Sequence, residues 1–133
     1  NVTFAICSAN GRVLAAIDDG GVCTINALSP SAHAGTSPTD YGRKGRIKGS
    51  TNVHYAALVD EDGRFRSDPE LRELFDAVGA FEKARAVCYC GGGISATMDA
   101  LALTRLGHPS VAVYDGSMSE WVRDPTLPME TGA

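Results

Sequence analysis

The segment AVCYCGGGISA, residues 86–96, is the part of the sequence that decides the fold. Its residues 86–90 form an uninterrupted apolar run, which is typical of a strand buried on both faces of a parallel sheet. Three glycines follow Cys90, and a helical pattern starts at Ser95. The segment therefore predicts a buried strand, a tight turn and a helix, with Cys90 at the point where the strand ends.

The sequence on both sides of this segment predicts one α/β domain that covers residues 1–133. Short β-branched runs alternate with helical patterns, which favours a parallel sheet with helices on both faces. A content of 44% hydrophobic and 21% charged residues is that of a globular chain and argues against disorder. The other expected strands are Val2–Ile6 at an edge, Val22–Ile25, a short central strand at Thr51–Val53, and Val111–Tyr114.

Three helices are expected between the strands. Asn10 and Asp68 are suited to cap helix N-termini, and Pro69 is suited to the first helical position after Asp68. Residues 29–49 are polar and turn-rich, and a loop of this length in a compact domain is often functional. The helix after the glycines is expected to run from Ser95 to Leu106 and to face the core with Met98, Leu101, Ala102 and Leu106.

The charge and the cysteines argue against several classes of protein. The net charge of −4 disfavours a nucleic-acid or membrane-surface binder, and no apolar run approaches the ~20 residues that span a bilayer. Cys88 and Cys90 form a C-x-C pair without a second pair, so no zinc or other metal site is expected. The four cysteines do not resemble a secreted disulfide framework, which favours a reducing, cytoplasmic setting. The chain starts at Asn1 without a signal peptide, and we interpret it as a piece of a longer protein.

Cys90 is the candidate nucleophile. Ligands bind at the carboxyl ends of the strands in open α/β sheets, and glycines there allow successive amides to point into one small bowl. The positive end of the following helix adds to that field and favours the thiolate, which is the reactive form. The alternative is a buried, inert cysteine, which is the interpretation favoured for Cys88. The expected anion cradle consists of Gly91, Gly92, Gly93, Ile94, Ser95 and Ala96.

Other motifs with glycines or a catalytic cysteine fit this segment poorly. A Walker A loop needs a lysine directly after its last glycine, and none follows here. The dinucleotide pattern G-x-G-x-x-G requires a glycine where this chain has Ala96. The phosphatase pattern C-x5-R requires an arginine at that same position, because the arginine grips the phosphate. Ala96 therefore argues against a phosphatase and weakens a dinucleotide site.

Three segments, in order along the chain, resemble the rhodanese family. Residues 45–53, GRIKGSTNV, are similar to its GHIPGAxNV segment. Residues 87–96, VCYCGGGISA, are similar to its active-site strand and loop, and residues 114–121, YDGSMSEW, to its YDGGxxEW segment. The resemblance runs over nearly the whole chain. It implies a five-stranded parallel sheet with helices on both faces, and a persulfide carried by Cys90.

The resemblance also implies a function and partners. A rhodanese-type sulfurtransferase moves sulfur from a small anionic donor, thiosulfate or 3-mercaptopyruvate, to a thiol or cyanide acceptor without a cofactor. The uncharged loop after Cys90 is similar to the CG[SA]GVTA loop of 3-mercaptopyruvate enzymes, so the donor stays open. The final segment is similar to the second, catalytic half of tandem-domain enzymes. This implies an inactive rhodanese domain upstream.

Two departures from the family pattern keep alternatives open. The D-A-R-S segment of the family is replaced by residues 26–29, so Asn26 and Leu28 stand for the usual acid and arginine. Their loss favours a non-catalytic rhodanese-like module that binds a partner or senses redox state. A third interpretation, a thiol reductase, requires a disulfide between Cys88 and Cys90.

Three further residues, and Ser95 of the cradle, are candidates for accessory roles. Arg43 and Arg46, from the polar loop, would supply positive charge for an anionic donor, or would simply be solvated surface residues. Ser95 would either donate a hydrogen bond to the site or cap the helix. Asp115, at the end of the last strand, would either brace the Cys90 loop or form a turn before Gly116.

Overall fold

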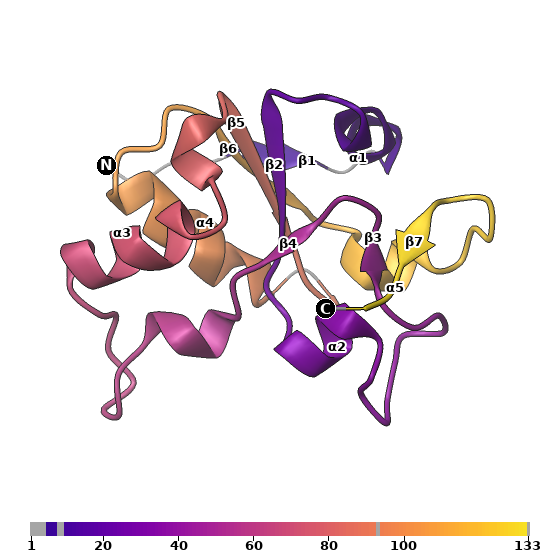
Figure 1. Cartoon of the computed structure of the whole chain (residues 1–133), viewed down its shortest axis with the longest axis horizontal. Coiled ribbons are helices and arrows are strands. Elements are labelled where there is room, and N and C mark those ends of the chain that lie inside the picture. Colours follow the sequence, from indigo (N-terminus) through magenta and orange to yellow (C-terminus); the bar gives the residue numbers. More distant parts are fainter. Residues whose placement is uncertain (1–4, 8–9, 93, 133) are drawn as a thin grey trace.

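The computed structural model describes residues 5–7, 10–92 and 94–132. Five parallel strands form the main sheet in the order β1-β6-β5-β2-β4, with β5 at its centre (Figure 1). A small second sheet pairs β3 with β7 in antiparallel fashion. In chain order the elements are β1 Ala5–Cys7, α1 Asn10–Ile17, β2 Val22–Asn26, α2 Pro30–Ala34, β3 Arg46–Ile47, β4 Thr51–Asn52, η1 Tyr55–Leu58, α3 Asp68–Asp76, η2 Ala80–Glu82, β5 Arg85–Tyr89, α4 Ala96–Arg105, β6 Val111–Tyr114, α5 Ser117–Trp121 and β7 Met129–Glu130.

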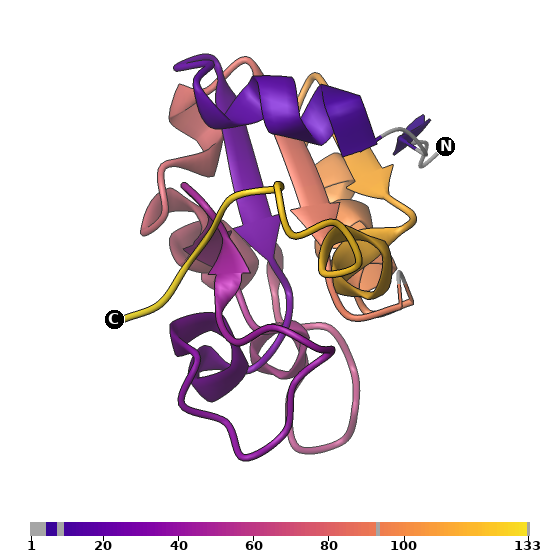
Figure 2. The same ribbon diagram turned by 90° about the vertical axis from the view of Figure 1, so that its right-hand side faces the viewer.

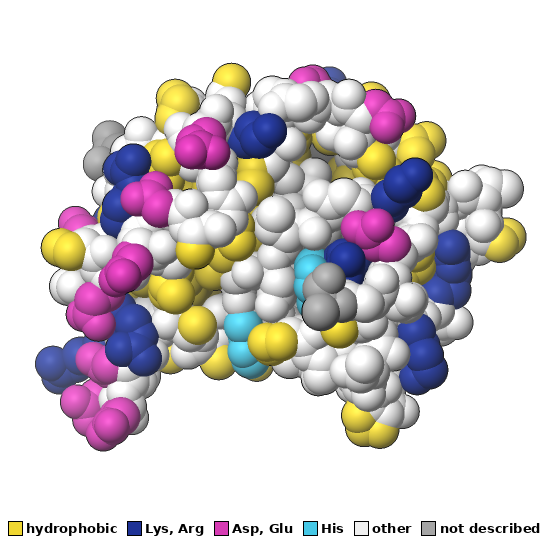
Figure 3. Space-filling model, in the orientation of Figure 1, with side chains coloured by type: hydrophobic (Ala, Val, Ile, Leu, Met, Phe, Trp, Pro, Cys, Tyr) yellow, Lys and Arg dark blue, Asp and Glu magenta, His cyan; other side chains and the backbone are white. Residues whose placement is uncertain are grey.

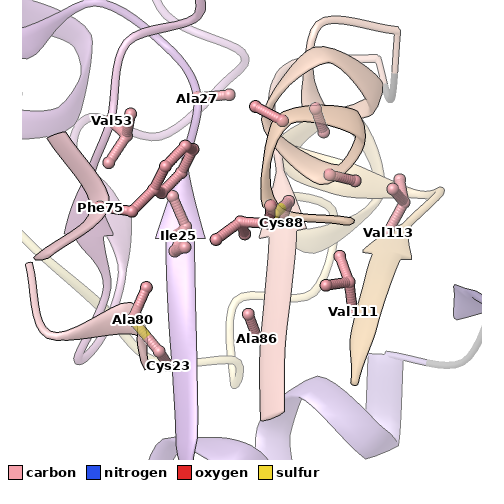
Figure 4. Close-up of a cluster of buried hydrophobic side chains, with 14 of the residues drawn as sticks. Cys23, Ile25, Ala27, Val53, Phe75, Ala80, Ala86, Cys88, Val111 and Val113 are labelled. Atoms are coloured by element: carbon pink, nitrogen blue, oxygen red, sulfur yellow. The ribbon is translucent and has the colours of Figure 1, made fainter. Parts of the chain in front are cut away.

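The predicted five-stranded parallel sheet with helices on both faces is confirmed. One face packs against α3, α4 and the two short 3-10 helices, and the other packs against α1 and α5 (Figure 2). The side chains of β5 alternate between the two cores, so Cys88 belongs to the first cluster and Val87 and Tyr89 to the second. Figure 4 shows the first cluster, in which Cys88 of β5 lies between Ile25 of β2 and Val113 of β6.

Two of the strands differ from the prediction or lie partly outside the described residues. The strand expected at the centre of the sheet, residues 51–53, is β4 and lies at its edge, so that placement was wrong. The Asn52 side chain there donates to the backbone carbonyls of Asn26 and Leu28 at 2.9 and 2.8 Å, and the chain then leaves the sheet for η1. Of the strand expected at Val2–Ile6, residues 2–4 lie outside the described residues, and β1 forms the opposite edge beside β6.

The ends and faces of two helices also differ from the prediction. Ser67, not Asp68, is the N-cap of α3, because its hydroxyl accepts from the Glu70 amide while the Glu70 carboxylate accepts from the Ser67 amide. In α4 the expected inward residue Leu101 is 36% exposed, whereas Ala100 is fully buried. Small side chains on this face allow the helix to lie close to the sheet. The buried face of α4 is therefore rotated from the predicted one.

The polar segment 29–49 is more regular than expected. It contains the short helix α2, capped by the Ser29 hydroxyl, and the strand β3, which pairs with β7 near the end of the chain. Gly45 passes so close to this tail that a β-carbon on it would overlap the Glu130 carbonyl oxygen. The indole of Trp121 donates to the Pro128 carbonyl at 3.1 Å. The segment and the tail therefore hold each other beside the main sheet.

Charge is spread unevenly over the face shown in Figure 3. Acidic and basic side chains gather over α3 and the turn that precedes it, where Arg66 pairs with Glu70 at 3.5 Å and Arg72 with Asp76 at 3.0 Å. The middle of this face carries few charges. None of the helices in the described part of the chain is long and apolar enough to cross a membrane.

Candidate active site

Cys90 lies directly after the central strand β5 and is only 2% exposed. Strands β2, β5 and β6 are parallel, so the segments that follow them meet at one edge of the sheet. Helix α4 begins at Ala96, so the loop after Cys90 connects the end of the central strand to the positive N-terminal end of a helix. This is the strand, turn and helix predicted from residues 86–96.

The backbone of Cys90 and Gly91 is held by the segment that follows β6. The Cys90 amide donates to the Ser117 hydroxyl at 3.1 Å, and the Cys90 carbonyl accepts from the Met118 amide at 2.9 Å. The Gly91 carbonyl accepts from both the amide and the hydroxyl of Ser119, at 2.9 and 2.8 Å. Four hydrogen bonds therefore fix the start of the loop against the N-terminus of α5.

Ser117 is a site residue that the sequence patterns did not indicate. It is fully buried, its φ of 50° lies in the left-handed region, and its hydroxyl also donates to the Tyr114 carbonyl at 2.8 Å. A left-handed serine is strained, and it persists only where the surroundings impose it. Asp115, which was expected either to brace the Cys90 loop or to form a turn, is exposed directly after β6. The hydrogen bonds that hold the start of the loop involve Ser117, Met118 and Ser119.

The loop after Cys90 is buried at its first residue and exposed further along. Gly91 is buried and Gly92 is exposed, and Gly93 lies outside the described residues. Ile94 is 84% exposed, so the loop presents a large apolar side chain to solvent beside Cys90. Ser95 is the N-cap residue of α4, as one of its two predicted roles required, but its side chain makes no capping hydrogen bond within the described residues.

The core directly beneath the site holds two buried titratable groups, Cys88 and Asp99. Burial raises the pKa of the Cys88 thiol well above its ordinary value, and the neighbouring Asp99 carboxyl contributes further. Asp99 on α4 is fully buried, and within the described residues its carboxyl oxygens have no hydrogen-bond partner. Burial therefore also raises the pKa of Asp99 well above its ordinary value. Cys23, Cys88 and Cys90 all carry free thiols.

The two candidate arginines lie in different places. The Arg46 guanidinium donates to Glu130 at 3.2 Å and to the carbonyls of His33 and Gly132 at 3.2 and 2.6 Å, so it anchors the tail of the chain. Arg43 donates to the Asp124 carbonyl at 3.0 Å. Its side chain also lines a small cavity whose other lining residues include Leu28, Tyr41 and Met118. Arg43 is thus the candidate that lines a cavity together with Tyr41 and Met118.

The replacement of the family's acid by Asn26 has a structural explanation. Asn26 is fully buried at the end of β2, where its side-chain oxygen accepts from the Leu28 amide at 2.7 Å and its amide donates to the Tyr89 hydroxyl at 3.1 Å. The Tyr89 hydroxyl also accepts from the Ile47 amide at 3.1 Å and contacts the Ser50 hydroxyl at 2.7 Å. Asn26 therefore belongs to a network of hydrogen bonds between uncharged groups, which joins β2, β3 and β5.

The fold and the site define the class of protein: a parallel α/β domain with a cysteine on a glycine loop between its central strand and a helix. The chain belongs to the rhodanese family, because the Rhodanese-like domain matches residues 13–124. It is 33% identical over 109 residues to thiosulfate/3-mercaptopyruvate sulfurtransferase 1 of Arabidopsis thaliana, covering 80% of this chain and 29% of that protein. It is 38% identical over 88 residues to the 3-mercaptopyruvate sulfurtransferase of Escherichia coli, covering 66% of this chain and 31% of that protein.

Solved structures agree with this assignment. The crystal structure of SseA from Escherichia coli, a 3-mercaptopyruvate sulfotransferase with the rhodanese fold, matches with a TM-score of 0.69 and 30% identity. The match covers 85% of this chain and 42% of that structure. The chain therefore spans less than half the length of these relatives.

Proposed function

We propose that this domain transfers sulfane sulfur from a small anionic donor to a thiophilic acceptor through a persulfide on Cys90. The observation that carries the proposal is the position of Cys90, between the end of the central strand and the N-terminus of α4, with its backbone held by Ser117 and Met118. The names of the relatives, thiosulfate and 3-mercaptopyruvate sulfurtransferases, support the same reaction.

The reaction proceeds in two displacements. The Cys90 thiolate attacks the outer sulfur of thiosulfate, a new S–S bond forms, and the old S–S bond breaks with its electron pair leaving on sulfite. With 3-mercaptopyruvate the C–S bond breaks instead, and the enolate that leaves takes a proton to become pyruvate. A thiophile such as cyanide or a thiolate then attacks the outer persulfide sulfur, and Cys90 departs as the thiolate.

The protein's contribution is to hold negative charge next to Cys90. Backbone amides of residues 91–96 and the N-terminus of α4 stabilise the thiolate, the persulfide and the anionic donor without a charged side chain in the loop. We assign the supporting positive charge to Arg43, because Arg46 is used to anchor the tail. No metal or other cofactor takes part in either displacement.

The proposal extends to the setting of the domain. An inactive upstream rhodanese domain would complete the substrate cleft of the whole protein, and a reducing, cytoplasmic environment would keep Cys90 as a thiol. Both stay predictions. Thiosulfate and 3-mercaptopyruvate stay the two donor candidates.

Intact-protein mass spectrometry after incubation with each donor tests the proposal. The wild-type chain is expected to gain one sulfur atom, which cyanide then removes as thiocyanate. Cys90→Ser should gain none, whereas the matched variant Cys88→Ser should gain it as the wild type does. A wild type that gains no sulfur from either donor, or a Cys90→Ser variant that gains it equally, would contradict the proposal and favour a non-catalytic binding or redox-sensing module.

A further inference from the structure

Tyr41 covers the start of the Cys90 loop. Its phenol lies so close to Gly91 that a β-carbon on Gly91 would overlap the hydroxyl and the Cζ atom of the ring. The φ angle of Gly91 is not in the left-handed region, so its backbone conformation does not require glycine. Glycine is required there because the Tyr41 ring occupies the space that a side chain would fill.

The Tyr41 ring lies between the buried start of the Cys90 loop and an open cavity. Cys90 is 2% exposed, so a donor reaches its sulfur only if a covering group moves. Tyr41 and Leu28 line a small cavity together with Arg43 and Met118. The same two residues also line a wider, open cavity of about 380 Å³. Tyr41 thus stands between the open cavity and the loop that carries Cys90.

The turn that carries Tyr41, residues 37–44, is held by exposed contacts within itself and by the bond from Arg43 to the Asp124 carbonyl. Asp40 accepts from the Gly42 amide at 2.8 Å and pairs with Lys44 at 3.6 Å, and Lys44 also donates to the Ser37 carbonyl at 3.3 Å. Tyr41 itself is 47% exposed. Exposed contacts of this kind contribute little stability, so an outward turn of the Tyr41 side chain costs little.

We propose that Tyr41 determines which sulfur donors reach Cys90. The ring closes over Gly91 in the resting domain, turns outward to admit a small donor, and excludes donors whose leaving group is bulky. Tyr41 acts through its bulk and its position, not on the sulfur itself. The inference rests on the proposed function, because it names a specificity residue for that reaction.

Two donors of identical chemistry and different size provide the test. Methanethiosulfonate and benzenethiosulfonate both deliver their terminal sulfur to a thiolate and release a sulfinate, which takes the electron pair of the broken S–S bond. The readout is the ratio of the two second-order rate constants for persulfide formation on Cys90. Tyr41→Ala is expected to raise the rate with the bulky donor, relative to the small one, about tenfold or more. Tyr41→Phe should keep the wild-type ratio, because it keeps the ring.

Tyr55→Ala is the matched control, since it also removes a partly exposed aromatic ring, which is 37% exposed in the wild type. It should leave the ratio unchanged. Gly91→Ala tests the same contact from the loop, because its new methyl group and the Tyr41 ring cannot occupy the same place. It should displace the ring and reproduce the ratio of Tyr41→Ala, and the double variant should shift the ratio no further. An unchanged ratio in Tyr41→Ala, or additive effects in the double variant, would overturn the inference.

Alkylation of Cys90 separates this inference from the proposed function. Iodoacetamide and N-phenylmaleimide differ in bulk and require no sulfur transfer, so their relative rates report access alone. Tyr41→Ala should increase the rate with N-phenylmaleimide relative to iodoacetamide. If no variant forms a persulfide but this ratio still rises, the proposed function fails and the role of Tyr41 in access stands. If persulfides form and neither ratio changes, only the role of Tyr41 fails.

Discussion

Cys88 lies within β5 and Cys90 directly follows it, two positions later, yet the surroundings of the two cysteines differ in kind. Both are buried and both belong to the same core cluster. Cys88 pairs in the ladder with Ile25 and Val113, so it is fixed by the sheet on both sides. Cys90 lies one residue beyond the strand, and its backbone is bonded to the segment after β6. Burial alone therefore does not distinguish Cys88 from Cys90, the proposed nucleophile; the surroundings of their backbones do.

The largest expected effect comes from replacing each cysteine in turn. Cys90→Ala should reduce sulfur transfer to the level of the protein-free blank, because it removes the nucleophile. Cys88→Ala should keep transfer near the wild-type rate but lower the free energy of unfolding by about 1–2 kcal/mol, because it leaves a small cavity. Thiocyanate formation and urea denaturation of the same preparations measure both quantities. Transfer that survives in Cys90→Ala, or is lost in a folded Cys88→Ala, would remove the contrast between the two positions.

A smaller effect is expected at the backbone that distinguishes Cys90. Ser117→Ala deprives the Cys90 amide of its acceptor and the Tyr114 carbonyl of a donor inside the protein, which should lower the free energy of unfolding by about 1–3 kcal/mol. The rate of persulfide formation should fall with it, because the start of the loop is less well held.

Ser119→Ala is the control for Ser117→Ala. The Gly91 carbonyl still accepts from the Ser119 amide after the hydroxyl is removed, so the loss should be about 1 kcal/mol or less. Urea denaturation and initial rates of persulfide formation show which of the two variants, Ser117→Ala or Ser119→Ala, loses more stability and activity. A larger loss in Ser119→Ala than in Ser117→Ala would mean that the hydroxyl of Ser117 is not what holds Cys90.

The sequence predicted those parts of the site that depend on neighbours along the chain. Residues 86–96 contain the buried strand, the glycines and the start of the helix, so the position of Cys90 followed from local patterns. The parallel sheet followed from the alternation of elements. Ser117 and Tyr41 were missed, because their roles depend on contacts with residues far away in the sequence. A buried serine after a strand and an exposed tyrosine in a polar loop carry no local signal of such contacts.

The edge position of β4 and the tail-anchoring role of Arg46 escaped prediction for the same reason. The resemblance to the rhodanese family placed residues 45–53 in a family segment, but it did not tell whether Arg46 faces the site or the tail. Its partners are Glu130 and two carbonyls, one of them that of Gly132, more than eighty positions away. Only the antiparallel pairing of β3 with β7 brings these groups together.

The smallest expected effect concerns Asp99, a buried residue of α4 that is a neighbour of Cys88 on β5. Burial raises the pKa of Asp99 above its ordinary value of 3.8, so the unfolded chain releases this proton at a lower pH than the folded chain does. The unfolded state therefore gains stability as the pH rises from about 4 toward the folded pKa, and the free energy of unfolding falls over that range.

Asp99→Asn removes this titration and keeps the size of the side chain. The variant should match the wild type below about pH 4 and should be more stable at neutral pH by about 1 kcal/mol, with the difference growing between the two. Urea denaturation of both proteins across this pH range measures the difference, and sulfur transfer should stay unchanged. A constant difference at all pH values would show that the Asp99 carboxyl does not change its charge on folding. Asp99 would then be ionised at neutral pH in the folded chain, and its charge would still raise the pKa of Cys88.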